Sequence, residues 1–126
     1  MVGMPGVVEA TPRAQIAALE PGHIAIAYYG HLQKAPADRL NGYLAESFNA
    51  ASGRPLFYSA QLNDPRAPLY FPVKSGTLPR NDYLGVTIAP DGTPWTGLVK
   101  LLSATPDAQG FIQSTGYVGR LIEGTR

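Results

Sequence analysis

Apolar residues along this chain gather in short runs, and turns rich in glycine and proline separate the runs. Pro21-Gly22 lies between QIAAL and HIAIAYY, and Pro90-Asp91-Gly92 lies between YLGVTIA and TPWTGLVKL. Gly adopts positive φ without steric cost, and Pro or Asp favours a turn, so each site predicts a hairpin between two strands. Polar stretches at 30–41, 63–82 and 103–114 are predicted to be surface loops.

The same order of elements occurs twice along the chain. Residues 15–29 align with residues 85–99 at an offset of 70. Further along, Gly42-Tyr43-Leu44 matches Gly116-Tyr117-Val118 at an offset of 74. Each half therefore reads strand, glycine turn, strand, loop and Gly-Tyr strand. Repeated β units of this kind are typical of propellers or stacked arrays.

Four antiparallel strands make one propeller blade. The first half has a fourth candidate strand at 55–62, which is rich in aromatic residues. The second half stops after three strands, and the apolar segment 6–10 is a candidate for its fourth, within the chain or in a neighbour. We therefore predict an all-β single domain, 1–126, of two four-stranded antiparallel propeller-type blades, with repeats at 11–62 and 83–123.

Helical signals support an alternative fold. Thr11-Pro12 resembles a helix start, because Thr is a good N-cap and Pro suits the first helical position. Apolar residues also recur at helical spacing further on, at Leu40, Leu44, Phe48 and Ala51. A small α+β domain, with helices at 12–20 and 36–52 packed on a sheet, is therefore the alternative.

Composition and charge exclude several classes of function. The 126 residues carry a net charge of +1 with no basic stripe, which argues against a nucleic-acid partner. Cysteine is absent, and His23 and His31 are isolated, so we expect neither a metal site nor a cofactor. No apolar run approaches the roughly 20 residues that span a bilayer. The N-terminal residues lack the features of a signal peptide, so we expect a soluble chain of undefined compartment.

Three stretches follow one another in an informative order. They are PGHIAIAYYG, NGYLAESFNAASGRPLFYSAQLNDP and RNDYLGVTIAPDGTPWTGLVK. This order resembles the C-terminal blades of bacterial sialidase-like propellers, the BNR or Asp-box group. The resemblance covers roughly residues 13–102 and, more weakly, 114–122. In that family the second stretch forms two strands, so the resemblance favours strand over helix at 42–48.

The Asp-box of that family reads Ser/Thr-x-Asp-x-Gly-x-Thr-Trp, and this chain has a compressed form of it. Residues 89–95, APDGTPW, keep Asp91, Gly92 and Trp95. The resemblance implies a stabilising turn whose Trp packs between strands. Contact between Trp95 and a sugar is the alternative role.

The family's chemistry suggests what this chain does. Sialidase-like enzymes hydrolyse a terminal sialic acid, with an Arg cluster for its carboxylate, a Tyr nucleophile helped by a Glu, and an acidic Asp. The acid Asp and the first Arg belong to early blades that this sequence does not contain. The resemblance therefore implies a carbohydrate-binding module without independent catalysis. A glycoside hydrolase of the exo-sialidase type, with its active site assembled between subunits, and an α+β protein of another role are the alternatives.

Several residues are candidates for the site, although each also fits a purely structural role in a surface loop, a strand or the core. Candidates for catalysis are Glu46, Asp82 and Tyr83. Candidates for ligand binding are Arg80, Arg54, Tyr29 and Trp95. Side chains alternate along a strand, so one of Tyr28 and Tyr29 is expected in the core and the other near a channel or loop.

Two blades cannot close a ring, because propellers have about 4–8 blades. An open pair would expose flat apolar blade faces, which favours association. The sequence is therefore expected to be a fragment or to assemble with copies of itself, and we favour a homo-oligomer in which three copies of two blades close a six-bladed ring. A sugar is the expected ligand.

Overall fold

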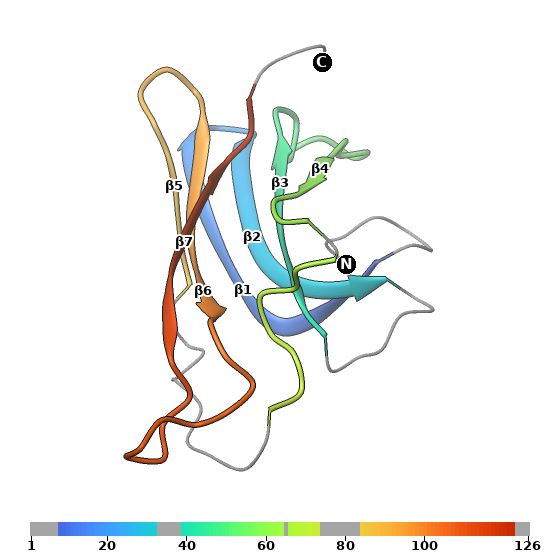
Figure 1. The fold of residues 1–126 in the computed structure, drawn as a ribbon. Coiled ribbons are helices and arrows are strands. Elements are labelled where there is room, and N and C mark those ends of the chain that lie inside the picture. Colours follow the sequence, from blue (N-terminus) through green and yellow to red (C-terminus); the bar gives the residue numbers. More distant parts are fainter. Residues whose placement is uncertain (1–7, 33–38, 65, 74–83, 123–126) are drawn as a thin grey trace.

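The computed structural model describes residues 8–32, 39–64, 66–73 and 84–122, and these form seven strands and no helix (Figure 1). The strands are β1 (Val8–Glu20), β2 (His23–Leu32), β3 (Asn41–Ser47), β4 (Tyr58–Gln61), β5 (Gly85–Ile88), β6 (Pro94–Leu101) and β7 (Ser114–Arg120). The predicted all-β class is therefore confirmed for the described residues.

The strands form two antiparallel sheets. The first has the order β1-β2-β3-β4 and the second has the order β5-β6-β7. The two sheets lie one against the other as layers (Figure 1). Side chains from β2, β3 and β5 meet between them, where Ala25, Ala27, Leu44 and Ile88 form one buried cluster.

Both predicted hairpin turns are confirmed. Gly22 connects β1 to β2 with a φ of 84°, and Gly92 connects β5 to β6 with a φ of 91°. These values lie in the left-handed region that favours glycine. The carboxylate of Asp91 accepts the backbone N–H of Thr93 at 3.0 Å, which fixes the second turn.

The strand pairs follow the offsets of the sequence repeat. Corresponding pairs are Ile16–Ile26 and Val86–Thr96, and Tyr28–Tyr43 and Leu98–Tyr117. The offset of 70 converts Ile16–Ile26 into Val86–Thr96. For the other two pairs, the offset of 70 converts Tyr28 into Leu98, and the offset of 74 converts Tyr43 into Tyr117. The second sheet is thus built as the first one is, as far as its third strand.

The helices of the α+β alternative are wrong for the described residues. Residues 12–20 belong to β1, and β3 occupies 41–47 of the second helical candidate, whose residues 36–38 lie outside the described part. Every residue of β3 is buried. A strand that is covered on both faces needs apolar residues on both, so the alternation that identifies a half-exposed strand is missing.

The predicted fourth strands differ from those observed. Within 55–62, only Tyr58–Gln61 pairs as β4. The described part of the candidate strand 6–10 does not complete the second sheet, because residues 8–10 extend β1 and pair with residues 30–32 of β2. Residues 6 and 7 lie outside the described part. Within the described part of the chain, the second sheet therefore has three strands.

The loop before residue 74 closes one end of the space between the sheets. Leu69 and Tyr70 are buried there with Tyr29, Leu98 and other side chains of one cluster. Backbone hydrogen bonds hold this loop to both sheets, because the N–H of Leu101 donates to the carbonyl of Leu69 at 2.9 Å and the N–H of Leu40 to that of Tyr70 at 2.9 Å. The loop therefore links β6 to the start of β3.

Candidate functional site

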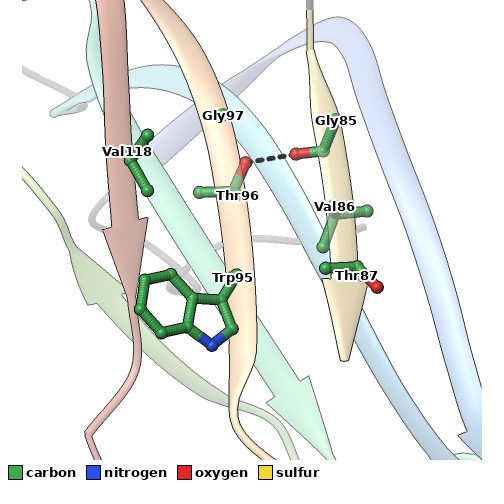
Figure 2. Close-up of a pocket in the computed structure, with 7 residues that line it drawn as sticks. All are labelled: Gly85, Val86, Thr87, Trp95, Thr96, Gly97 and Val118. Carbon is green, nitrogen blue, oxygen red and sulfur yellow. Dashed lines mark hydrogen bonds between the residues drawn. The ribbon is translucent and has the colours of Figure 1, made fainter. Parts of the chain in front are cut away.

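A shallow hollow of about 330 Å³ lies on the three-stranded sheet (Figure 2). Its lining is almost entirely apolar, and it consists of Gly85, Val86 and Thr87 of β5, Trp95, Thr96 and Gly97 of β6, and Val118 of β7. Val118 is 69% exposed, whereas its neighbour Gly119 faces Leu62 in the interior. Side chains alternate along a strand, so Val118 and the hollow belong to the face turned away from the first sheet.

Three glycines open this outer face. Gly85 and Gly97 pair directly, and Gly116 follows on the neighbouring strand. Among the described residues, no atom lies within 4 Å of a Cβ placed at Gly85, Gly97 or Gly116. By contrast, a Cβ at Gly42 would lie 2.3 Å from Leu98 Cδ1. Internal packing therefore explains Gly42 but not the three glycines of the outer face.

A glycine inside a strand costs stability, about 0.5–1 kcal/mol relative to alanine. Such a glycine often marks a place where a ligand or another backbone approaches closely. Gly85 and Gly97 form the floor of the hollow, beside the hydroxyl of Thr96, which donates to the carbonyl of Gly85 at 2.6 Å (Figure 2). As far as the structure describes the chain, the outer face is thus open to an approaching molecule down to its backbone.

Trp95 borders the hollow and carries charged neighbours. Arg120 pairs with Trp95 across the strands, and its guanidinium carbon lies 5.1 Å from the centre of the indole ring. Hydrogen bonds from Thr93 hold the pKa of the Asp91 carboxyl below its usual range, and the charge of Arg120 adds to this effect. An aromatic ring, a guanidinium and a carboxylate therefore meet at one end of the sheet.

A second polar group lies between the two sheets. His23 Nε2 is 2.7 Å from Oε2 of Glu46, and Glu46 has no exposed surface. The ring of Phe48 stacks on the imidazole at a centroid distance of 4.5 Å. This pair joins the start of β2 to β3, and its burial keeps substrates away. Glu46 therefore lacks the open position that an acid/base group needs, in contrast to the expectation that it faces a channel or solvent.

The other sequence candidates are spread over the molecule. Tyr29 is 2% exposed, and its hydroxyl accepts the N–H of Val99 at 2.8 Å. Tyr28 is fully buried as well. Tyr29 packs edge-on against Tyr70 of the loop before residue 74, at a centroid distance of 5.4 Å, so it reaches a loop and not a channel. Arg54 is exposed in the loop between β3 and β4, and it does not line the hollow.

Three candidates, Arg80, Asp82 and Tyr83, lie outside the described residues. Of the described residues chosen from sequence, only Trp95 lines the hollow, and its indole lies on the outer face beside Arg120 of β7. Sequence reasoning missed Arg120 and Val118. The repeat contained the necessary signal, since the offsets of 70 and 74 place both residues opposite β6 once the strands are paired.

The described residues contain no cluster of three His, Asp or Glu side chains that would hold a metal ion. That part of the chain also has no helix of the length and apolar character needed to cross a membrane. Comparisons with known protein families, with curated proteins and with solved structures found no match for this chain.

Proposed function

We propose that this protein is a carbohydrate-binding module related to the sialidase-like propellers, and that a saccharide binds on the outer face of β5, β6 and β7. The observation that carries the proposal is the position of Trp95 at the rim of a glycine-floored hollow, with Arg120 over its ring. Ligand sites generally combine an apolar, aromatic surface with a few polar groups that fix orientation. This face has both components.

The chemistry of a sugar ring suits this surface. A pyranose has an apolar face of C–H groups and a rim of hydroxyls. The indole of Trp95 and the bare backbone of Gly85 and Gly97 suit the apolar face. The hydroxyl of Thr87, the guanidinium of Arg120 and the carboxylate of Asp91 supply donors and acceptors for the rim.

Size and charge favour binding over hydrolysis. The volume of about 330 Å³ is at the lower end of the range for ligand sites, about 300–1,000 Å³, and is enough for one sugar unit. Glycoside hydrolysis normally uses two carboxyl groups on either side of the scissile bond. In the described residues no carboxylate lines the hollow itself, Asp91 lies beside it at the end that carries Trp95 and Arg120, and Glu46 is enclosed between the sheets. A pair of carboxyl groups on either side of a bound sugar is therefore missing among these residues.

Trp95 is the sole tryptophan of the chain, so its fluorescence reports directly on the proposed site. We expect a saturable change in emission when the full chain is titrated with a panel of neutral, amino and acidic monosaccharides. An open site for a single sugar binds weakly, so the sugar concentrations must be high enough to measure a Kd of about 1 mM. This Kd corresponds to a binding free energy of about −4.1 kcal/mol.

The affinities of variants are compared by calorimetry, because Trp95→Ala removes the fluorescent indole. We expect Trp95→Ala to lose at least tenfold in affinity and Phe111→Ala to bind as the parent does. Phe111 is a matched control, since it is a 52% exposed aromatic residue in the loop before β7. The proposal is wrong if no sugar binds at millimolar concentration or if Trp95→Ala retains the parent affinity.

A further inference from the structure

Among the strands that the structure describes, β7 lies at the edge of the second sheet, and the direction of its backbone groups can be assigned. The N–H of Leu102 donates to the carbonyl of Gln113 at 2.9 Å, and the N–H of Leu121 donates to that of Pro94 at 3.2 Å. Antiparallel strands bond through every second residue. Odd-numbered residues of β7 therefore bond to β6, and the N–H and C=O groups of Gly116 and Val118 point to the free edge.

In the first sheet, β3 corresponds to β7, and its outward edge pairs with β4. The N–H of Leu62 donates to the carbonyl of Gly42 at 2.8 Å, and Leu44 pairs with Ala60 of β4. The offset of 74 relates Gly42 and Leu44 to Gly116 and Val118. Groups that bond to a fourth strand in the first sheet thus face outward from β7. None of the hydrogen bonds recorded for the described residues joins these outward groups to another segment.

Nothing within β7 protects this edge from pairing. Proteins usually guard an exposed edge with Lys, Pro, a bulge or a short strand. β7 has seven residues, STGYVGR, with an unbroken register against β6 and no charge before Arg120. Val118, at its exposed side, is 69% accessible. The strand is therefore a ready template for another extended chain.

We propose that β7 pairs antiparallel with β7 of a second copy of this chain, centred on Tyr117, so that two three-stranded sheets become one sheet of six strands. In this register the outward groups of Gly116 face those of the partner's Val118. The same contact recurs on the other side of the two-fold axis, as an isologous interface requires. Ser114 lies opposite the partner's Arg120 at each end.

The side chains favour this register over its neighbours. Registers that keep the outward groups opposite one another are centred on Gly116, Tyr117 or Val118. Centring on Val118 would place two exposed valines side by side, and centring on Gly116 would place two glycines together. Only the register centred on Tyr117 sets each Val118 beside a glycine, which leaves room for it and accounts for a Gly116 that internal packing does not require. This inference does not depend on saccharide binding.

Proline at position 118 tests the edge without breaking the sheet. The N–H of Val118 points away from β6, so Val118→Pro removes a bond only to the partner, and proline is tolerated on such an edge. Val118→Thr is the matched control, because it keeps the N–H and the side-chain volume. Trp95 emission checks that each variant is folded. An edge contact is small, below about 1,200 Å², so association is measured by sedimentation equilibrium up to millimolar chain.

We expect the parent and Val118→Thr to approach twice the single-chain mass of 13.4 kDa, and Val118→Pro to associate at least tenfold more weakly. A parent that stays at the single-chain mass overturns the proposal. Equal association of the parent and Val118→Pro, or a parent mass of three chains, also overturns it, because the contact would then use another surface.

A cysteine tests the register, since the chain has none of its own. Tyr117 is the residue that meets its own copy, at a non-hydrogen-bonded position where Cα atoms are about 4.5 Å apart. That distance suits a disulfide. We expect Tyr117→Cys to form a covalent dimer under mild oxidation at least tenfold faster than Ser114→Cys, which lies away from its own copy. Equal rates contradict the proposed register.

Discussion

His23 and Glu46, which are 23 residues apart in the sequence, form a hydrogen bond of 2.7 Å between the two sheets. The two atoms are Nε2 of the imidazole and Oε2 of the carboxyl group, and both side chains are buried. His23 begins β2, and its ring lies 3.7 Å from the position of a Cβ at Gly92, in the turn of the opposite hairpin. The pair therefore satisfies two buried polar side chains where the turn of one sheet packs on the other.

Removal of one partner should strongly destabilise the fold. Glu46→Ala leaves the imidazole of His23 buried without this acceptor, and breaking a buried pair typically costs about 3–5 kcal/mol. We expect a loss of that order in the free energy of unfolding, measured with urea. The double variant His23→Ala/Glu46→Ala should lose less than the sum of the two single variants. Additive losses would show that the two side chains are not coupled.

Tyr29 supports the sheets through one hydrogen bond. Its hydroxyl accepts the N–H of Val99 at 2.8 Å, and both residues are buried. Tyr29→Phe should leave that N–H without an acceptor, at a cost of about 1–3 kcal/mol. Tyr58→Phe is the control, because Tyr58 is 43% exposed and water can replace its partners. A Tyr29→Phe variant as stable as Tyr58→Phe would contradict the assigned role of this hydroxyl.

Local chemistry explains which parts of the fold could be predicted from the sequence. The hairpin turns at Gly22 and Gly92 could be predicted, because the preference for positive φ depends on the residue itself and its immediate neighbours. β3 was ambiguous, because its burial on both faces depends on a second sheet that is distant in the sequence. Residues 8–10 of the candidate strand 6–10 do not join the second sheet within the chain, because register, which sequence alone does not give, assigns them to the edge of the first sheet.

The candidate site shows the same division. Trp95 could be chosen because it belongs to a recognisable turn motif. Arg120 reaches the indole only through the pairing of β6 with β7, so finding it requires extending the repeat to the register of these two strands. His23 looked isolated because its partner, Glu46, lies on another strand. Contacts across a sheet depend on register, and a one-residue slip would reverse every side chain.

Tyr28 and Tyr43 predict a limit to stability at high pH. Their rings stack at a centroid distance of 5.3 Å on the face of the first sheet that is turned away from the second. Burial raises the pKa of both phenols above the ordinary value of 10.0. A raised pKa in the folded state means that folding favours the neutral form. Their contribution is therefore complete below pH 10 and is lost as the pH rises through the folded-state pKa.

Absorbance of phenolate near 295 nm measures this effect. Of the seven tyrosines, we expect Tyr28 and Tyr43 to ionise only together with unfolding, as followed by circular dichroism. Tyr43→Phe should remove one of the late-titrating groups and shift the alkaline unfolding midpoint upward relative to the unfolding midpoint in urea. Titration of all seven groups while the fold is intact would contradict the burial of this pair.

Gly42 and Gly97 provide a direct test of what the glycines of this fold are for. A Cβ at Gly42 would lie 2.3 Å from Leu98 Cδ1 and 3.0 Å from Leu69 Cδ1, both in the buried cluster. Gly42→Ala should therefore overpack the interior, which typically costs about 1–3 kcal/mol. At Gly97 no described atom lies within 4 Å, so Gly97→Ala should stabilise the strand by about 0.4–1 kcal/mol.

The two variants separate stability from binding. If the floor of the hollow receives a saccharide, the added methyl of Gly97→Ala should weaken binding although the protein becomes more stable. Gly42→Ala should leave the affinity unchanged under conditions in which the variant is folded, because its methyl points between the sheets. Urea midpoints and calorimetric titrations of both variants measure the two effects. A destabilised Gly97→Ala would mean that this glycine is required by the chain itself, and an unchanged affinity would place the ligand elsewhere.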